Sequence, residues 1–509
     1  MAKEKKRIKL KFRIALTAFF FLLQVFFIYL TTFVLKQDYF WLYSAFELMG
    51  VATVIYIVNK RGNPSYKIAW IVFILTLPVF GILVYLLWGG QRTFPHLKRK
   101  MKKCEAGYKK LLKQDQHVKD LINYENNALT RQAFYICNES GYPVYNNTSV
   151  EYLSPGEVFF KRFIEELNKA QKYIFLEYFI IAEGKMWNEV LKVLTKKASE
   201  GVTVKIIFDD FGSANRQYNN FLQRLKSKNI SVAVFNPVKP PFDIFMNNRD
   251  HRKITVIDGN VAFTGGINIG DEYINQYERF GHWLDSSVML KGKAVDSFAV
   301  MFATMWEYIT SEPIRLSKYL LSRNEEANGY VIPYCDGPMD YASTAQGIYM
   351  QIINTSHRFV YIATPYLILD NNMINSLVLA AKSGVDIRIV TPSTPDKFYV
   401  HPATQFHYTE LLEAGVRIYE YTPGFIHSKM FVSDDAIATV GSVNMDYRSF
   451  VFHFECGAWF TEESVVGEVK AHFKNIFDKS KEIKLEEWKK RGFFTAVKQW
   501  FFHLFSPLM

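Results

Sequence analysis

Three long apolar runs dominate the start of the chain. They span Ile14–Leu35, Tyr39–Val58 and Ile68–Trp88. Each is close to the ~20 residues that a helix needs to cross the ~30 Å hydrocarbon core of a bilayer. A cleaved signal peptide fits poorly, because the first run is longer than the apolar core of such a peptide and no small-residue cleavage site follows it. The pattern therefore predicts a membrane anchor over residues 1–90 with two or three transmembrane helices.

The charges that flank these runs leave the number of spans, and the side of the membrane that carries the rest of the chain, open. Lysine and arginine cluster before the first run, between the second and third runs, and directly after the third. Such clusters favour the cytoplasmic side, so three full spans conflict with the charges on both sides of the third run. Pro78 and Gly81 interrupt the third run and Glu47 lies in the second. We expect one of these two runs to be re-entrant or interfacial.

From about Phe134 the pattern changes to short apolar strands that alternate with amphipathic helices, and the series occurs twice. The first copy has strands at 173–180, 201–207 and 232–236 with helices at 187–199 and 221–228; the second has strands at 360–367, 384–390 and 416–421 with helices at 373–383 and 408–414. This alternation is typical of βαβ units. We predict an α/β fold in which two tandem domains, residues 134–330 and 331–485, have mixed sheets flanked by helices. A basic helical linker over residues 91–133 joins them to the N-terminal transmembrane region.

The end of the chain combines aromatic and basic residues. Trp488–Phe505 mixes Trp and Phe with Lys and Arg. This composition is typical of a helix that lies at a lipid interface, although a helix packed on the domain would look similar. We predict an amphipathic interfacial helix within residues 486–509.

Composition and charge narrow the class of protein. With 49% hydrophobic residues the chain can bury large cores, which excludes disorder. Its formal net charge of +12 suits anionic partners, either nucleic acid or an anionic membrane, although lysines and arginines that set membrane topology account for part of the excess. The four cysteines are scattered and show neither the spacing of a zinc site nor a disulfide framework.

A His-x-Lys-x4-Asp motif closes each copy of the repeat, and an asparagine follows in a tail of small residues. The residues are His251, Lys253, Asp258 and Asn268 in the first copy, and His427, Lys429, Asp434 and Asn444 in the second. Apolar alternation predicts that each motif lies on a strand, where residues two positions apart share a face. The His and Lys of each motif then point together, and the Asp points to the opposite face in a structural role. The asparagine amides can donate hydrogen bonds to an anion.

Two such motifs favour phosphate chemistry over metal binding. Each supplies one His beside a Lys, and a cation next to a ligand opposes the charge of a metal ion. Two His and two Lys that converge would bind a phosphodiester instead. One imidazole can attack phosphorus, and the other can protonate the leaving alkoxide and then activate the acceptor hydroxyl. We expect no metal and no cofactor.

The paired motifs, their Gly-Gly-x-Asn and Gly-Ser-x-Asn-x-Asp-x-Arg-Ser tails and the duplication resemble the phospholipase D superfamily. Several stretches are similar to bacterial cardiolipin synthases: Pro64–Trp70, His251–Gly259, Asp271–Tyr273 and Ser506–Met509. The resemblance covers nearly the whole chain. It departs at the N-terminus, where the chain has one apolar run more than the two usual in that family.

The resemblance implies roles for individual residues. His251 would be the nucleophile and His427 the general acid and base, while the lysines of both motifs bind the phosphate oxygens without a metal. In this superfamily a carboxylate downstream of each motif orients its histidine, and Asp285 and Glu455 lie at suitable positions.

The resemblance also implies a reaction, which is phosphatidyl transfer between two phosphatidylglycerol molecules to give cardiolipin and glycerol. The partners are then phosphatidylglycerol and anionic lipids of a bacterial cell membrane, in which the chain would be a multi-pass protein. A hydrolytic phospholipase D shares every catalytic residue and remains an alternative. A nuclease is disfavoured, because short nucleases of the superfamily carry one motif per chain and lack an anchor, so no nucleic acid is expected. An inactive lipid-binding protein would be expected to have lost a motif residue, and all six are present. The sequence leaves the oligomeric state and the head-group preference open.

Overall fold

The chain folds into two compact units. The computed structural model describes residues 22, 26, 29, 40–60, 62–89, 95–125, 128–213, 216–217, 220–237, 247–320, 325–340 and 343–506. The N-terminal unit comprises Met1–Arg92 with Val238–Asn247 and Leu504–Met509, and the catalytic unit comprises Thr93–Pro237 and Asn248–His503.

The N-terminal unit contains three described helices. These are α2 (Phe40–Asn59), α3 (Pro64–Thr76) and α4 (Pro78–Trp88). The third apolar run is divided at Leu77, because a residue before proline disfavours helical angles and Pro78 has no N–H to donate. Trp70 of α3 packs edge-on against Tyr85 of α4, with ring centroids 5.2 Å apart.

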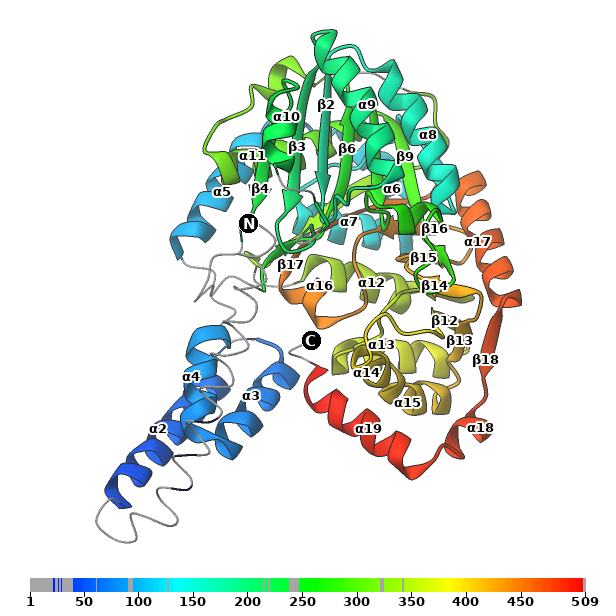
Figure 1. The fold of residues 1–509 in the computed structure, drawn as a ribbon. Coiled ribbons are helices and arrows are strands. Elements are labelled where there is room, and N and C mark those ends of the chain that lie inside the picture. Colours follow the sequence, from blue (N-terminus) through cyan, green and yellow to red (C-terminus); the bar gives the residue numbers. More distant parts are fainter. Residues whose placement is uncertain are drawn as a thin grey trace. The chain divides into compact units, whose positions relative to one another are not determined.

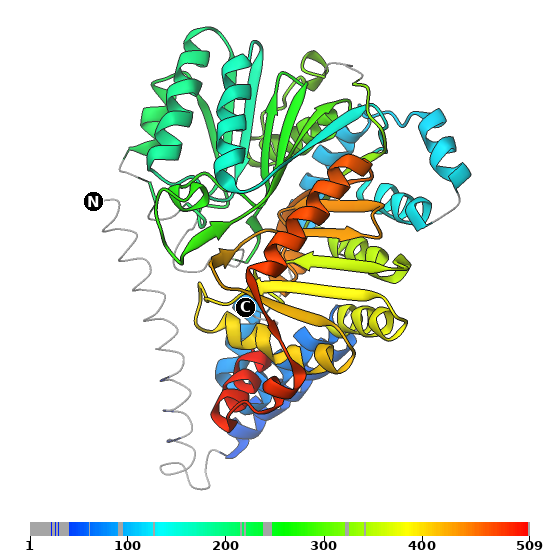
Figure 2. The ribbon, with the colours of Figure 1, turned by 90° about the vertical axis from the view of Figure 1, so that its right-hand side faces the viewer.

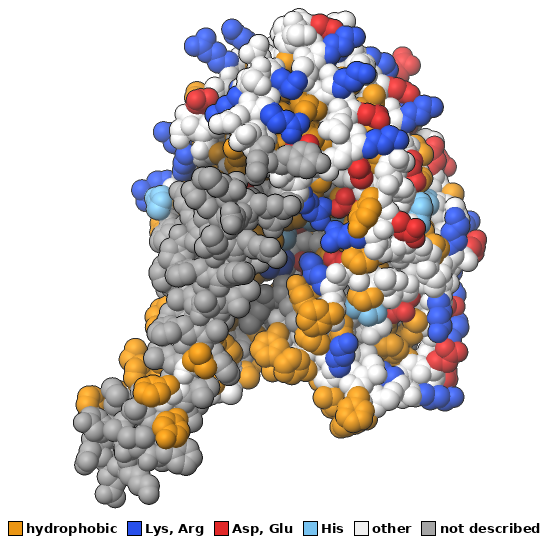
Figure 3. All heavy atoms as spheres, in the orientation of Figure 1, with side chains coloured by type: hydrophobic (Ala, Val, Ile, Leu, Met, Phe, Trp, Pro, Cys, Tyr) orange, Lys and Arg blue, Asp and Glu red, His pale blue; other side chains and the backbone are white. Residues whose placement is uncertain are grey.

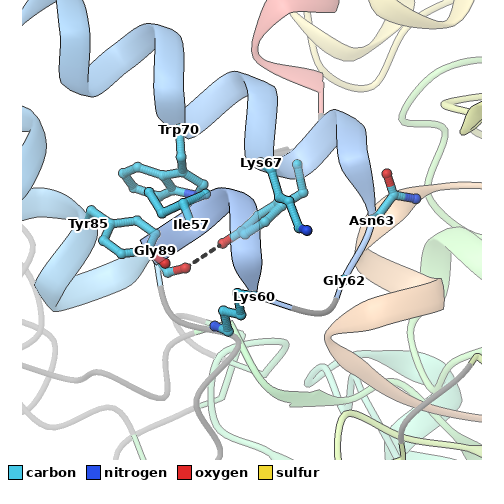
Figure 4. Close-up of a pocket in the computed structure, with 9 residues that line it drawn as sticks. Ile57, Lys60, Gly62, Asn63, Lys67, Trp70, Tyr85 and Gly89 are labelled. Carbon is cyan, nitrogen blue, oxygen red and sulfur yellow. Dashed lines mark hydrogen bonds between the residues drawn. The ribbon is translucent and has the colours of Figure 1, made fainter. Parts of the chain in front are cut away.

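Two glycines of this unit lie where α3 and α4 meet. A Cβ on Gly81 would lie 2.8 Å from the Cα of Ile74, so only glycine lets α4 approach α3 this closely. The Tyr66 hydroxyl donates to the carbonyl of Gly89 at 3.3 Å, as Figure 4 shows, and this bond ties the end of α4 to α3.

The structure does not support the predicted transmembrane region. Within the described part of the chain, no helix is long and apolar enough to cross a membrane. The third run forms helices of 13 and 11 residues, and each is shorter than the ~20 residues that a span requires. Most of the first run, Ile14–Leu35, lies outside the described residues.

The catalytic unit contains two mixed sheets of the same plan (Figures 1 and 2). The first has the order β1-β9-β7-β6-β2-β3-β4. Its strands are β1 (Thr148–Leu153), β2 (Tyr173–Tyr178), β3 (Thr203–Asp209), β4 (Ser231–Phe235), β6 (Lys253–Ile257), β7 (Val261–Gly265) and β9 (Ser287–Gly292). Strands β2, β3 and β4 are parallel, and the others are antiparallel to their neighbours. The helices of this domain are α8 (Gly156–Lys169), α9 (Lys185–Ser199), α10 (Phe221–Lys226) and α11 (Val295–Thr310), with 3-10 turns η2 (Asp271–Ile274) and η3 (Leu316–Lys318).

The second sheet repeats this order and adds a strand, β10-β17-β16-β15-β11-β12-β13-β18. Its strands are β10 (Val331–Asp336), β11 (Phe359–Ala363), β12 (Asp386–Pro392), β13 (Arg417–Tyr421), β15 (Met430–Ser433), β16 (Ile437–Gly441), β17 (His453–Phe460) and β18 (Ser480–Ile483). Its helices are α12 (Thr344–Thr355), α13 (Asn371–Lys382), α14 (Val400–Phe406), α15 (Tyr408–Glu413), α16 (Tyr447–Val451) and α17 (Glu463–Asp478). The predicted α/β fold with two similar domains and mixed sheets is confirmed.

The two domains share a hydrophobic core. Buried side chains of β2, β6 and α11 from the first domain form one cluster with those of β15, β17 and α17 from the second. The central strands β2 and β11 are buried on both faces, which explains their uninterrupted apolar runs in the sequence. This shared core joins the two domains rigidly enough to build one site from both.

Three described helices lie in the segment before the first sheet. They are α5 (Pro95–Lys109), α6 (Gln116–Glu125) and α7 (Ala128–Ser140).

The catalytic unit ends in α18 (Leu485–Lys489) and α19 (Phe493–Leu504). Several large apolar side chains of α19 lie in the open, with Phe494 86% exposed. The others are Phe493, Val497, Trp500, Phe501 and Leu504. On the face drawn in Figure 3, hydrophobic side chains gather at the end of the catalytic unit where Figure 1 places α19.

Candidate active site

The two domains exchange short strands around the motifs. Strand β5 (Arg249–Asp250), which precedes His251, pairs in parallel with the start of β17. In the same way β14 (Gly424–Ile426), which precedes His427, pairs in parallel with β8 (His282–Leu284) of the first domain. Each motif histidine is thus led into place by the opposite domain.

Backbone hydrogen bonds extend this exchange to the histidines themselves. The N–H of His251 donates to the carbonyl of Phe454 at 2.9 Å, and the N–H of His427 donates to the carbonyl of Leu284 at 2.7 Å. Phe454 and Leu284 directly precede Glu455 and Asp285 in the sequence.

The carboxylates are consequently crossed between the domains. Nδ1 of His251 lies 2.9 Å from Oε1 and 3.1 Å from Oε2 of Glu455, and Nδ1 of His427 lies 2.6 Å from Oδ2 of Asp285. The expectation that each carboxylate serves the histidine of its own motif is wrong, because the strand exchange brings each next to the other domain's histidine. With Nδ1 held by a carboxylate, Nε2 of each imidazole is the nitrogen left for chemistry.

The motif lysines lie buried beside the histidines. Lys253 is 2% exposed and Lys429 is 1% exposed, and each ammonium donates to the backbone carbonyl of the histidine two residues earlier. Burial lowers the pKa of Lys253 to about 8 and the pKa of Lys429 to about 7. Burial, with the positive charge of the lysines, also holds the pKa of both histidines well below the usual range. A bound anion would offset this concentration of positive charge.

The histidines do not lie on the motif strands as predicted. Strand β6 begins at Lys253 and β15 begins at Met430, so His251 and His427 lie in the segments that cross between domains. Apolar alternation identifies the strands correctly. It carries no information on where the pairing with the other domain ends.

The motif aspartates have a structural position. Asp258 accepts hydrogen bonds from the three backbone N–H groups of residues 171–173, at 2.7 to 2.8 Å. Asp434 accepts three from residues 357–359, at 2.7 to 2.9 Å. Both lie past the far end of the motif strand, on the order of 15 Å along it from the lysine. Asp258 and Asp434 were predicted as members of the catalytic motif with a structural role, and the structure places them away from the reacting groups.

The two tail asparagines differ. Oδ1 of Asn268 accepts from the N–H of Ile180 at 3.0 Å, and its amide donates to the Tyr273 hydroxyl at 2.8 Å. Asn444 is buried, and its Oδ1 has no hydrogen-bond partner among the described residues. Substrate binding by these amides stays a prediction.

Aromatic rings that the sequence analysis missed pack against the histidines. On His427 lie Trp283 and Tyr273, with ring centroids at 5.2 and 5.7 Å. On His251 lie Phe179 and His453, at 4.9 and 5.3 Å. His453 and Trp283 occupy matching positions, two residues before Glu455 and Asp285 respectively. That equal offset is the signal in the sequence that could have identified them.

The carboxylates themselves are supported differently. The hydroxyl of Ser442 donates to Glu455, and the matching position of the first tail is Gly266. A Cβ at Gly266 would lie 2.1 Å from Oδ1 of Asp285, so only glycine leaves room for that carboxylate.

One group of side chains has the composition of a metal site. Ligand atoms of His251, His453 and Glu455 lie within 4.8 Å of one another. His251 and Glu455 already bond each other, and the buried ammonium groups of Lys253 and Lys429 would repel a divalent cation. This donor set therefore fits an orienting network better than a metal ligand sphere.

Comparisons with known proteins agree with this geometry. A sequence model of the family described as "Cardiolipin synthase, PLD-like domain" matches residues 163–306 and 349–477, and one described as "Phospholipase_D-nuclease N-terminal" matches residues 49–90. An uncharacterized protein of Streptococcus mutans is 40% identical over 90% of this chain and 100% of its own length. A cardiolipin synthase of Geobacillus kaustophilus is 34% identical over 91% of this chain and 92% of its own. The crystal structure of a phosphatidylserine synthase from Haemophilus influenzae shares the fold, with a TM-score of 0.57 and 14% identity over 74% of this chain and 97% of that one.

The duplicated fold and the paired site define a phosphatidyltransferase of the phospholipase D type. Within that class, the chain belongs to the cardiolipin synthase family of PLD-like proteins.

Proposed function

We propose that this enzyme transfers a phosphatidyl group from one phosphatidylglycerol to a second, giving cardiolipin and glycerol through a covalent phosphatidyl-histidine. The crossed site carries the proposal, because it brings two carboxylate-held histidines and two buried lysines from both domains into one place. Related chains of similar length bear the name cardiolipin synthase.

In the first step the donor phosphodiester lies between Lys253 and Lys429, whose ammonium groups bind its oxygens. Nε2 of His251 attacks phosphorus, and a P–N bond forms as the bond from phosphorus to the glycerol oxygen breaks. His427 gives its Nε2 proton to that oxygen, so glycerol leaves as a neutral alcohol. The negative charge of the bound phosphodiester offsets the lysines and so favours the protonated form of His427.

The second step reverses the proton transfer. His427, now neutral, takes the proton of a glycerol hydroxyl on the second phosphatidylglycerol. The freed oxygen attacks phosphorus, the P–N bond breaks, and His251 is released with cardiolipin as product. Burial of both histidines and lysines limits access of water, which would otherwise give phosphatidic acid.

The substrates imply that the reaction takes place at a bilayer of a bacterial cell. The exposed aromatic side chains of α19 support contact with a lipid interface, because such rings settle at the boundary between head groups and acyl chains. We propose that the C-terminal segment, residues 486–509, is this interfacial element.

The decisive experiment uses purified protein in detergent, phosphatidylglycerol labelled in its head-group glycerol and in its acyl chains, and no divalent metal ion. Cardiolipin and free glycerol in equal amounts are the expected products. Phosphatidic acid as the main product would show a hydrolase, and the absence of any lipid product would refute phosphatidyl transfer. The His251→Ala protein, prepared identically, is the control for contaminating activity.

A further inference from the structure

Two cations of the second domain lie near the catalytic histidines without an acidic partner. They are Arg448 of α16 and Lys397 of the segment between β12 and α14. Within the described residues, neither has a carboxylate at ion-pair distance: Nε of Arg448 donates to Nε2 of His453 at 3.4 Å, and the Lys397 ammonium lies 5.1 Å from the centre of the Tyr366 ring. The terminal guanidinium nitrogens of Arg448 are thus left for another acceptor.

Arg448 contacts a neighbour of His251, and the charge of Lys397 acts on both histidines. Arg448 reaches His453, whose ring centroid lies 5.3 Å from that of His251. Lys397 is exposed, and its charge contributes to the lowered pKa of both His251 and His427. Asp446 is influenced by both cations, although its carboxylate is occupied in capping α16 through the N–H of Ser449 at 2.7 Å.

The first domain differs at the position that matches Arg448. The position equivalent to Arg448, four residues after the tail asparagine, is Glu272. Glu272 binds Arg216 at 2.5 Å and lies 3.7 Å from Arg279, so the cations nearby have an acidic partner. The duplication thus kept the motif lysines in both halves, but among the described residues the position of Arg448 carries a cation without an ion pair in the second half and an ion-paired acid in the first.

Transfer between two phosphodiester lipids requires two phosphate positions. The motif lysines hold only the phosphate under attack. The second lipid brings its own phosphate, separated from the reacting hydroxyl by the carbons of one glycerol, and this second anion must also be bound near the histidines. Guanidinium suits it well, because its donors match two phosphate oxygens at once.

We propose that Arg448 and Lys397 bind the phosphodiester of the acceptor lipid and so select a phosphatidylglycerol over water or free glycerol. This inference rests on the proposed function and names the half of the site that receives the second substrate. Lys397, at the exposed edge, meets the incoming head group, and Arg448 holds it beside His251.

The test compares two reactions of one enzyme. Incorporation of labelled glycerol into phosphatidylglycerol uses an acceptor without phosphate, whereas cardiolipin formation uses an acceptor with one. For Arg448→Gln and for Lys397→Gln we expect cardiolipin formation to fall about 10-fold or more relative to glycerol incorporation, since a charged hydrogen bond to phosphate is lost. Arg279→Gln, which removes a partly exposed cation near Glu272, should leave the ratio unchanged.

Equal loss of both reactions in the two variants would show that these residues act on the donor step or on folding, and would overturn the proposal. An unchanged ratio would overturn it as well. Because Lys397 is exposed, its variant is expected to fold, which thermal unfolding of the purified protein verifies. If the unmodified enzyme incorporates glycerol but makes no cardiolipin, the proposed function itself fails, and this result is distinct from the failure of the acceptor site.

Discussion

The two halves of the active site have the same arrangement of strands, but different side chains surround the histidine of each motif. The strand order, the exchanged strands and the lysine contacts are the same in both. Around His427 the neighbours are Tyr273 and Trp283, while around His251 they include His453, which in turn contacts Arg448. The duplication preserved the buried lysines and the strands around them, and it diverged in the rings that pack on the two histidines, to which we assign unequal roles.

The largest expected effect separates the two histidines. His251→Ala should abolish both products and any covalent adduct, because no nucleophile remains. His427→Ala should lower turnover by about 10²- to 10⁴-fold, the usual worth of a general acid and base. Rapid quenching with acyl-labelled lipid, followed by denaturing electrophoresis, should reveal labelled protein for the unmodified enzyme and for His427→Ala only. Labelled protein in the His251→Ala sample would show that His427, and not His251, is the nucleophile.

The next effect tests the crossing of the carboxylates. Asp285→Asn and Glu455→Gln keep the shape of each side chain and remove its charge, and we expect each to cost on the order of 10²-fold or more in kcat. In double variants, Glu455→Gln should lower kcat little further once His251 is replaced by a weak nucleophile. In the same way, Asp285→Asn should lower kcat little further once His427 is replaced. If the effect of Asp285→Asn on kcat disappears when His251 is replaced instead, Asp285 acts on His251, as the sequence analysis expected.

A pH profile compares the two lysines. Each must be protonated to bind phosphate, and its pKa is lowered to about 8 for Lys253 and about 7 for Lys429. Raising the pH through these values removes the charge, so kcat/KM for phosphatidylglycerol should fall by about 10-fold or more between about pH 7 and about pH 9. Lys429→Arg cannot lose its proton in this range. In the residual activity of this variant, kcat/KM should therefore fall at a higher pH than in the unmodified enzyme. If kcat/KM falls at the same pH, a group other than Lys429 causes the fall.

The smallest effect on chemistry is expected at the motif aspartates. Asp258→Asn weakens a carboxylate that accepts three backbone hydrogen bonds, and we expect a loss of about 1.5–3 kcal/mol in stability. Thermal unfolding should show a lower Tm, with kcat close to that of the unmodified enzyme at temperatures where both are folded. Asp434→Asn should behave in the same way. A large loss of kcat without a change in Tm would place either aspartate in the mechanism.

Much of the fold could be predicted from the chain because its signals are local. Apolar runs of strand length, such as Tyr173–Tyr178, and the equal spacing of the two copies indicated the repeated domains. The break at Pro78 had a local signal as well. The sequence analysis underestimated this break. The apolar composition of the third run suits a spanning helix, but it does not show that the run divides into two short helices at Pro78.

The site was predictable in its residues and not in its connections. His251 and Lys253 stand in one motif, whereas the bond from His251 to Glu455 joins residues 204 positions apart in different domains. That bond depends on the register of β5 against β17, which leaves no periodic trace in either strand. Arg448 stands within a motif of the sequence. The folded chain was needed to see that no described carboxylate lies at ion-pair distance from it, whereas Glu272 at the matching position has such a partner.

The crossed carboxylates make the order of synthesis a safeguard. A nascent chain that has emerged through the first domain already contains His251, but this histidine has no carboxylate to orient it until Glu455, far toward the C-terminus, has been made and folded. His427 depends equally on Asp285 of the earlier domain. A truncated or half-folded product therefore lacks the carboxylate that holds Nδ1 of its histidine, and neither histidine is oriented until both domains are folded.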